Sequence, residues 1–72
     1  MKDVSSLLEL GKKIKTLRQK QNISQEQLAQ QCGFDRTYIS MLERGKRNPS
    51  FLNLQKLCTG LQVNLSILLK DL

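Results

Sequence analysis

The sequence has no histidine or tryptophan, and its 72 residues include only two cysteines, one proline and three aromatic side chains. Without histidine the most frequent general base is missing, and no evident constellation joins a nucleophile to a base and an orienting group. The two cysteines do not form a C-x-x-C pair, so a zinc site would lack ligands. These absences argue against an enzyme and leave no evident metal or other cofactor.

Long apolar runs are also missing, and the N-terminus shows no secretory signal. We therefore expect a cytoplasmic protein without a membrane segment, in which the thiols of Cys32 and Cys58 are reduced and buried. A disulfide between them, or redox sensing through Cys32, is the alternative, since sequence alone does not show the environment of a thiol.

Basic residues, by contrast, are abundant. Twelve Lys and Arg stand against six Asp and Glu, which gives a net charge of +6. Such an excess is typical of a phosphate-binding surface, although many small domains are basic for solubility alone. Hydrophobic residues make up 39% of the chain and strand-forming residues are few, so we predict one all-α domain over residues 1–72.

The segment 23–44 has the pattern of two short helices joined by a turn. Ser24 and Gln27 form a capping box, which starts the first helix at the residue after the serine. Gly33 allows a left-handed backbone conformation, so the chain can turn sharply there. Asp35 then caps the second helix, which begins at the next residue. Two helices so close in sequence must cross closely.

Small and apolar residues complete a helix-turn-helix pattern. Ala29 permits a close helix crossing, and Ile39 and Leu42 supply apolar positions on the second helix. The sequences D-R-T-Y-I-S and E-R-G-K-R-N-P-S follow in the expected places. On these residues the chain resembles the lambda-repressor-like (Cro/C1, XRE-type) DNA-binding domains over about residues 8 to 70, and most of all restriction–modification controller proteins. The resemblance implies a compact five-helix domain with the helix-turn-helix at helices 2 and 3.

Amphipathic patterns predict the other helices. A first helix runs to Gln21, with Asp3 or Ser5 as its cap, and its apolar residues recur at helical spacing: Leu7, Leu10, Ile14 and Leu17. Ser50 caps a fourth helix, whose apolar stripe consists of Leu54, Leu57, Cys58 and Leu61. The end of this helix is open, because Gly60 lies inside it and Gln62 stands where the family usually has glycine.

Asn64 caps a fifth helix over residues 65–72, which is unusually apolar. A core of this size cannot cover all of its apolar side chains, and exposed surface of this kind usually marks an interface. We therefore expect a homodimer, with an interface drawn from Leu65, Ile67, Leu68, Leu69 and Leu72.

The outward face of the second motif helix is the candidate for contacting base pairs in the major groove. Arg36 suits a bidentate pair with guanine, and Thr37 offers a methyl group for thymine. The predicted base contacts are Arg36, Thr37, Ser40, Met41 and Arg44. The predicted phosphate contacts, several of them implied by the resemblance, are Gln25, Tyr38, Arg47, Asn48 and Ser50. Tyr38 could instead cover the junction between the two helices, and the basic loop could simply be solvated.

Arg18 lies beside the apolar stripe of the first helix, where an unpaired guanidinium would be costly. Glu43 is on the inward face of the recognition helix. The family pairs an arginine and a glutamate at the matching positions, so the resemblance supports a structural Arg18–Glu43 ion pair. Independent solvated charges are the alternative.

These features together predict a sequence-specific, dimeric transcriptional regulator. Its partner is a double-stranded DNA operator with an inverted repeat, and no small-molecule ligand is evident. The resemblance implies control of a restriction–modification system, either as a repressor or as an activator. The alternatives are a phage-type repressor and an antitoxin-like protein-interaction module in which the helix-turn-helix is only a scaffold.

Overall fold

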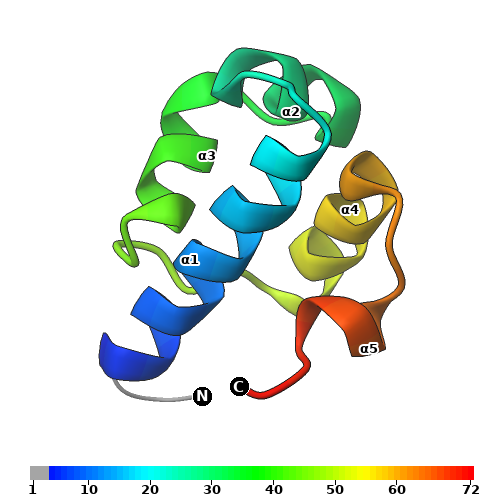
Figure 1. The fold of residues 1–72 in the computed structure, drawn as a ribbon. Helices are drawn as coiled ribbons and strands as arrows, with labels where there is room; N and C mark the ends of the chain where they lie inside the picture. Colours follow the sequence, from blue (N-terminus) through cyan, green and yellow to red (C-terminus); the bar gives the residue numbers. More distant parts are fainter. Residues whose placement is uncertain (1–3) are drawn as a thin grey trace.

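The computed structural model describes residues 4–72, which form five helices and no strand within that range (Figure 1). The helices are α1 (Val4–Lys20), α2 (Gln25–Cys32), α3 (Arg36–Glu43), α4 (Phe51–Leu61) and α5 (Leu65–Leu68). In Figure 1, α1 crosses the middle of the molecule, with α3 on one side of it and α4 and α5 on the other. The predicted all-α, five-helix fold is therefore confirmed.

Side-chain caps set the starts of α2 to α5. In the capping box of α2, the Ser24 hydroxyl accepts the Gln27 N–H at 3.0 Å, and the Gln27 amide oxygen accepts the Ser24 N–H at 2.8 Å. The side chain before each of the next three helices also accepts the N–H three residues ahead: Asp35, Ser50 and Asn64. These starts are as predicted. For α1, Ser5 lies inside the helix, and Asp3 lies outside the described residues.

Left-handed residues end α2 and α4. Gly33 has φ 81° after α2, and Gln62 has φ 59° after α4. Gln62 thus occupies the position and conformation of the glycine that the family usually has. Gly60 lies within α4, where an added Cβ would collide with the Sγ of Cys32 at the end of α2. Here glycine allows two helices to approach closely.

The core consists of apolar side chains from all five helices. Those with almost no exposed surface are Leu10, Ile14, Leu28, Ile39, Leu42, Leu57, Leu61 and Leu68. Cys32 and Cys58 are free thiols buried in the same core. Burial raises the pKa of Cys32 to about 11, so almost no thiolate forms at neutral pH. The expectation of reduced, buried thiols is supported, and redox sensing through Cys32 is disfavoured.

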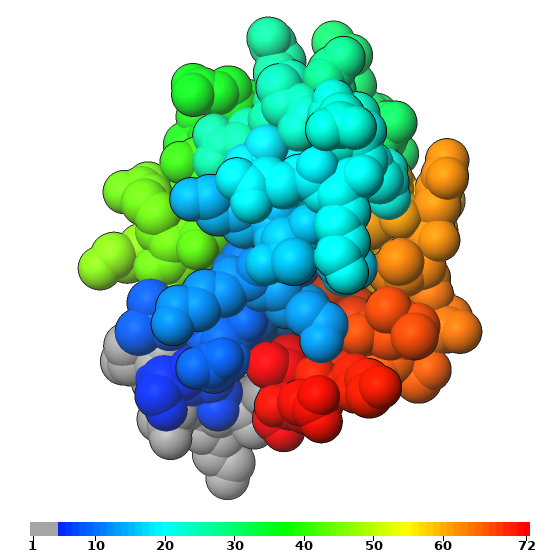
Figure 2. Space-filling view, viewed as in Figure 1, coloured from blue at the N-terminus to red at the C-terminus, as the bar shows by residue number. Residues whose placement is uncertain are grey.

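The C-terminal helix is shorter than predicted, because α5 covers only Leu65–Leu68 and a turn follows. Leu68 was expected to face a partner chain, but it is fully buried where α5 packs on α1 and α4. That assignment is wrong, and Leu65 and Leu69 are half-buried against the same core. After α5 the chain returns to α1, where the Nζ of Lys13 donates to the carbonyl of Lys70 at 3.1 Å (Figure 2).

Candidate nucleic-acid interface

The two faces of α3 have opposite environments. Ile39 and Leu42 are buried beneath the helix, whereas Arg36 and Thr37 are exposed in its first turn. Asp35 caps this turn through the N–H of Tyr38, at 2.9 Å. The start of α3 therefore projects from the domain on a fixed backbone, as a helix that enters a major groove must.

The other three predicted base contacts lie further along α3. Ser40 and Met41 are half-buried, so each offers only part of its side chain to a ligand. Arg44 is exposed and caps the end of the helix, and its Nε donates to the carbonyl of Ser40 at 3.3 Å. The guanidinium is thereby drawn back toward α3, so Arg44 reaches less far outward in this conformation than Arg36 could.

A largely buried ion pair holds the inner side of α3 to α1. The Nε of Arg18 lies 2.6 Å from Oε2 of Glu43, and the side chains are only 12% and 3% exposed. A second bond joins the Nη2 of Arg18 to Oε1 at 3.1 Å, and Nη1 donates to the carbonyl of Ile23 at 2.9 Å. The predicted Arg18–Glu43 pair is confirmed, and its geometry is bidentate, which is the strongest arrangement for these two groups.

Gln25 joins this network from the start of α2. Its Nε2 donates to Oε1 of Glu43 at 3.1 Å, so one amide N–H that could have faced a phosphate is directed inward. An amide nitrogen carries two N–H donors, which leaves the second for a phosphate. The sequence did not indicate this bond, which ties α2 to the ion pair between α1 and α3.

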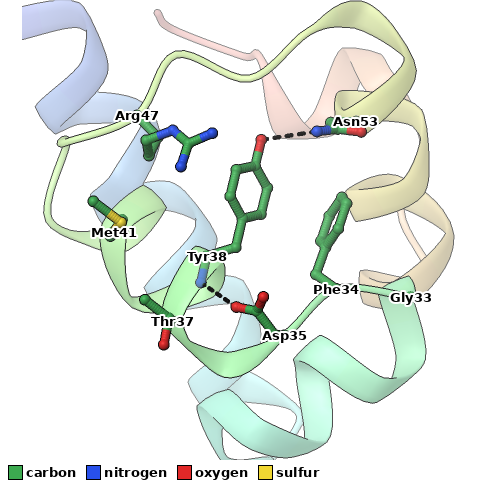
Figure 3. Close-up of a pocket in the computed structure, with 8 residues that line it drawn as sticks. All are labelled: Gly33, Phe34, Asp35, Thr37, Tyr38, Met41, Arg47 and Asn53. Carbon is green, nitrogen blue, oxygen red and sulfur yellow. Dashed lines mark hydrogen bonds between the residues drawn. The ribbon is translucent and has the colours of Figure 1, made fainter.

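Tyr38 lies at the centre of a cluster beside α3 (Figure 3). Its ring packs edge-on against Phe34, with centroids 4.7 Å apart, and the guanidinium of Arg47 lies 4.9 Å from its centroid. Its hydroxyl accepts a hydrogen bond from the Nδ2 of Asn53 at 2.9 Å. Tyr38 thus covers the junction between α2 and α3, which was one of its two predicted roles, and its phosphate contact stays a prediction.

An open hollow of about 420 Å³ adjoins this cluster. Its lining combines the turn between α2 and α3 with side chains of α3, α4 and the connection between them: Gly33, Phe34, Asp35, Thr37, Tyr38, Met41, Arg47 and Asn53 (Figure 3). Predicted base and phosphate contacts therefore surround one surface depression. Neither Phe34 nor Asn53 was predicted to be a site residue, although both contact Tyr38, over which Arg47 lies.

The connection between α3 and α4 brings three predicted phosphate contacts together. Arg47 and Asn48 are exposed. The hydroxyl oxygen of Ser50 accepts the Asn53 N–H at 3.1 Å, which leaves the hydroxyl proton as its possible donor. With Gln25 and the start of α3, these groups form the candidate DNA-binding surface, which we call the DNA face.

Among the described residues, three exposed apolar side chains were not predicted from the sequence: Leu8 on α1, which is 42% exposed, and Phe51 and Leu52 on α4. Phe51 and Leu52, the first two residues of α4, are 60% and 68% exposed. Of the apolar residues predicted at the dimer interface, Ile67 and Leu72 remain 43% and 41% exposed. Helical spacing indicates exposure for Leu52, which lies off the stripe of Leu57 and Cys58, but not for Phe51, which is almost in line with Cys58.

Other functional classes find little support in the described part of the chain. Within residues 4–72, no group of three or more His, Cys, Asp or Glu side chains could hold a metal ion. None of the described helices is both long and apolar enough to span a membrane. The exposed first turn of α3 and the basic residues around it are therefore the candidate functional site.

Comparison with known proteins also points to a DNA-binding function. A helix-turn-helix family model matches residues 14–68. Control protein C.MunI from Mycoplasma sp is 47% identical over 66 residues, which cover 90% of this chain and 89% of that protein. Control protein C.BamHI from Bacillus amyloliquefaciens is 48% identical over 54 residues, 74% of this chain and 67% of that protein.

Comparison with solved structures points to the same group of proteins. The crystal structure of the restriction-modification controller protein C.AhdI from Aeromonas hydrophila matches with a TM-score of 0.87 and 39% identity, over 89% of this chain and 97% of that one. The chain therefore belongs to the helix-turn-helix family of DNA-binding transcriptional regulators and, within it, to the restriction–modification control proteins.

Proposed function

We propose that this protein acts in the cytoplasm as a homodimer that binds an operator with an inverted repeat and regulates transcription of a restriction–modification system. The relatives named as control proteins support the regulated system. The single observation that carries the DNA-binding role is the exposed first turn of α3 above an inner face fixed by the Arg18–Glu43 pair. The protein contributes binding alone and performs no catalytic step.

Base recognition falls to the outward side of α3. Arg36 donates two hydrogen bonds to O6 and N7 of a guanine, and the Thr37 methyl group packs on a thymine. Ser40, Met41 and Arg44 contribute at the edge of this surface, since the first two are half-buried and the third is drawn back.

DNA phosphates lie on both sides of the base-contacting surface of α3. Gln25 offers its second amide N–H at the start of α2, where the helix dipole also favours an anion. On the other side of α3, the connection to α4 contacts the sugar–phosphate backbone through Arg47, Asn48 and Ser50. The ring of Tyr38 packs against the guanidinium of Arg47. Such contacts fix the register of the protein on the duplex and add affinity that depends on salt.

A second copy of the chain covers the exposed apolar residues at α5 and the start of α4. These two helices contact one another, so Ile67, Phe51 and Leu52 lie on adjoining elements (Figure 1). Leu72 lies beside α5, and Leu65 and Leu69 contribute only their exposed edges. A two-fold dimer of this kind places two copies of α3 in successive major grooves, so the half-sites should be about 34 Å apart.

The proposal is tested by selecting duplexes from a random pool and measuring how tightly wild type and Arg36→Ala bind the selected sequence. We expect an inverted repeat to emerge. The variant should lose about 1–3 kcal/mol of binding free energy and should no longer discriminate at one base pair of each half-site. An enriched sequence without symmetry would reject the dimeric operator, and an unchanged base preference would remove Arg36 from base recognition.

A further inference from the structure

Two aromatic rings with a cation at each end form a row beside α3. Arg47 stands over Tyr38, Tyr38 packs on Phe34, and the Nζ of Lys56 lies 5.6 Å from the centroid of the Phe34 ring. The row begins in the connection after α3 and ends in the second turn of α4. Figure 3 shows its first three members along the hollow.

The position of Lys56 follows from α4 itself. Asn53 and Lys56 are three residues apart on this helix, so their side chains emerge on the same side. Asn53 already points at the hydroxyl of Tyr38, which borders the hollow of the DNA face. Lys56 therefore stands on the DNA side of α4, one helical turn beyond Asn53.

Lys56 is also available to a ligand. It is exposed, and among residues 4–72 no carboxylate forms an ion pair with it. The Phe34 ring attracts the ammonium group and restricts where it can move. A cation that is already held in place loses less freedom when it binds, which favours a role in binding over simple solvation.

We propose that Lys56 is a further phosphate contact, which extends the DNA face from the connection along α4 past the turn between α2 and α3. This inference rests on the proposed binding of an operator through α3. The ligand is a DNA phosphate on the strand that Arg47 contacts. It lies further along that strand than the phosphate bound by Arg47. A lysine ammonium acts there as a point charge that displaces counterions and carries no base preference.

The test compares salt dependence of binding for wild type, Lys56→Gln, Lys56→Arg and Arg47→Gln. Two duplexes of equal length are used, one selected from a random pool and one of random sequence. Lys12→Gln is the matched control, because it removes the same charge from an exposed position on α1, beside the C-terminal residues rather than α3. Circular dichroism checks that each variant remains folded.

We expect Lys56→Gln to lower the slope of log affinity against log salt by about one unit per bound chain, on both duplexes alike, and Lys56→Arg to keep the wild-type slope. Lys12→Gln should change the slope less. Equal effects of Lys12→Gln and Lys56→Gln, or a Lys56 effect confined to the selected duplex, would overturn the proposal.

The Arg47→Gln variant distinguishes failure of the Lys56 proposal from failure of the proposed function. If Arg47→Gln lowers the slope and Lys56→Gln does not, the proposed function stands and the extension to Lys56 is wrong. If wild type binds neither duplex, the proposed function itself fails.

Discussion

At the helix-turn-helix end of the molecule, α1, α2 and α3 are joined by a buried bidentate ion pair, an inward-facing glutamine and a close helix crossing. At the other end, α5, the turn after it and the start of α4 leave four large apolar side chains exposed: Phe51, Leu52, Ile67 and Leu72. The first region pairs its largely buried charges within one chain, and among the described residues it leaves one large apolar side chain exposed, Leu8 at 42%. The second leaves apolar surface that a single chain of this size does not cover.

This difference separates two requirements of a DNA-binding regulator. The backbone of α3 must be fixed before any base is contacted, and the contacts beneath it achieve that without a partner. Affinity, in contrast, needs more base pairs than one short helix can contact, which is the reason for the second copy that we propose. Variants of the first region should therefore affect folding, and variants of the second should affect assembly.

On folding stability, the largest effect is expected from breaking the ion pair. Glu43→Gln or Arg18→Ala strands one charge in a nearly buried site, so each should lower the free energy of unfolding by about 3 kcal/mol. The double variant should lose clearly less than the sum, because it leaves no unpaired charge. Urea melts at one fixed protomer concentration measure all three, with the exposed Glu26→Gln as control. Strict additivity would mean that the two charges do not stabilise each other.

A smaller loss is expected where α1 crosses the end of α3. An added Cβ at Gly11 would lie 2.5 Å from the carbonyl oxygen of Leu42 and 2.6 Å from that of Glu43, so the two helices must separate. Gly11→Ala should cost about 2 kcal/mol net, even though alanine favours a helix. Thermal or urea melts test this against Lys12→Ala, the exposed neighbour on the same helix. Wild-type stability in the alanine variant would show that the crossing has room to spare.

The smallest effect on the fold, and the largest on assembly, is expected at Ile67. Because this side chain is exposed to 43% within one chain and lies outside the core, Ile67→Asp should change the folding stability of the monomer by only about 0.5 kcal/mol. A buried carboxylate at the interface would nevertheless separate the dimer and sharply weaken operator binding. Sedimentation and gel shifts measure both, with Thr59→Asp on exposed α4 surface as control. A wild-type chain that is monomeric at micromolar concentration, and binds DNA as one copy per site, contradicts the dimer.

Local features of the sequence predicted most of the fold. Each cap joins a side chain to a backbone group three residues away, so Ser24, Asp35, Ser50 and Asn64 could be recognised without tertiary information. The Arg18–Glu43 pair joins residues 25 positions apart. The inward face of the recognition helix made Glu43 the candidate partner, and the family resemblance supported that choice.

Contacts between helices explain what the sequence did not predict. Periodicity placed Leu68 on an apolar stripe but could not show that the core of the same chain buries this residue. Likewise nothing in the residue spacing joins Asn53 to Tyr38, or Gln25 to Glu43. The glycine inside α4 could be explained only once Cys32 was seen beside it.

The caps at the starts of α2 to α5 also bear on how fast the chain folds. These helices have 8, 8, 11 and 4 residues, lengths at which an isolated helix in water is at best marginal. A cap joins a side chain to the N–H only three residues ahead, so it favours one starting residue for each helix while the chain is still unfolded. Docking then joins segments whose boundaries are already set, and short-range contacts of this kind are typical of domains that fold within microseconds to milliseconds. Because the contacts that hold α3 also lie within one chain, the recognition helix does not need a second copy in order to form.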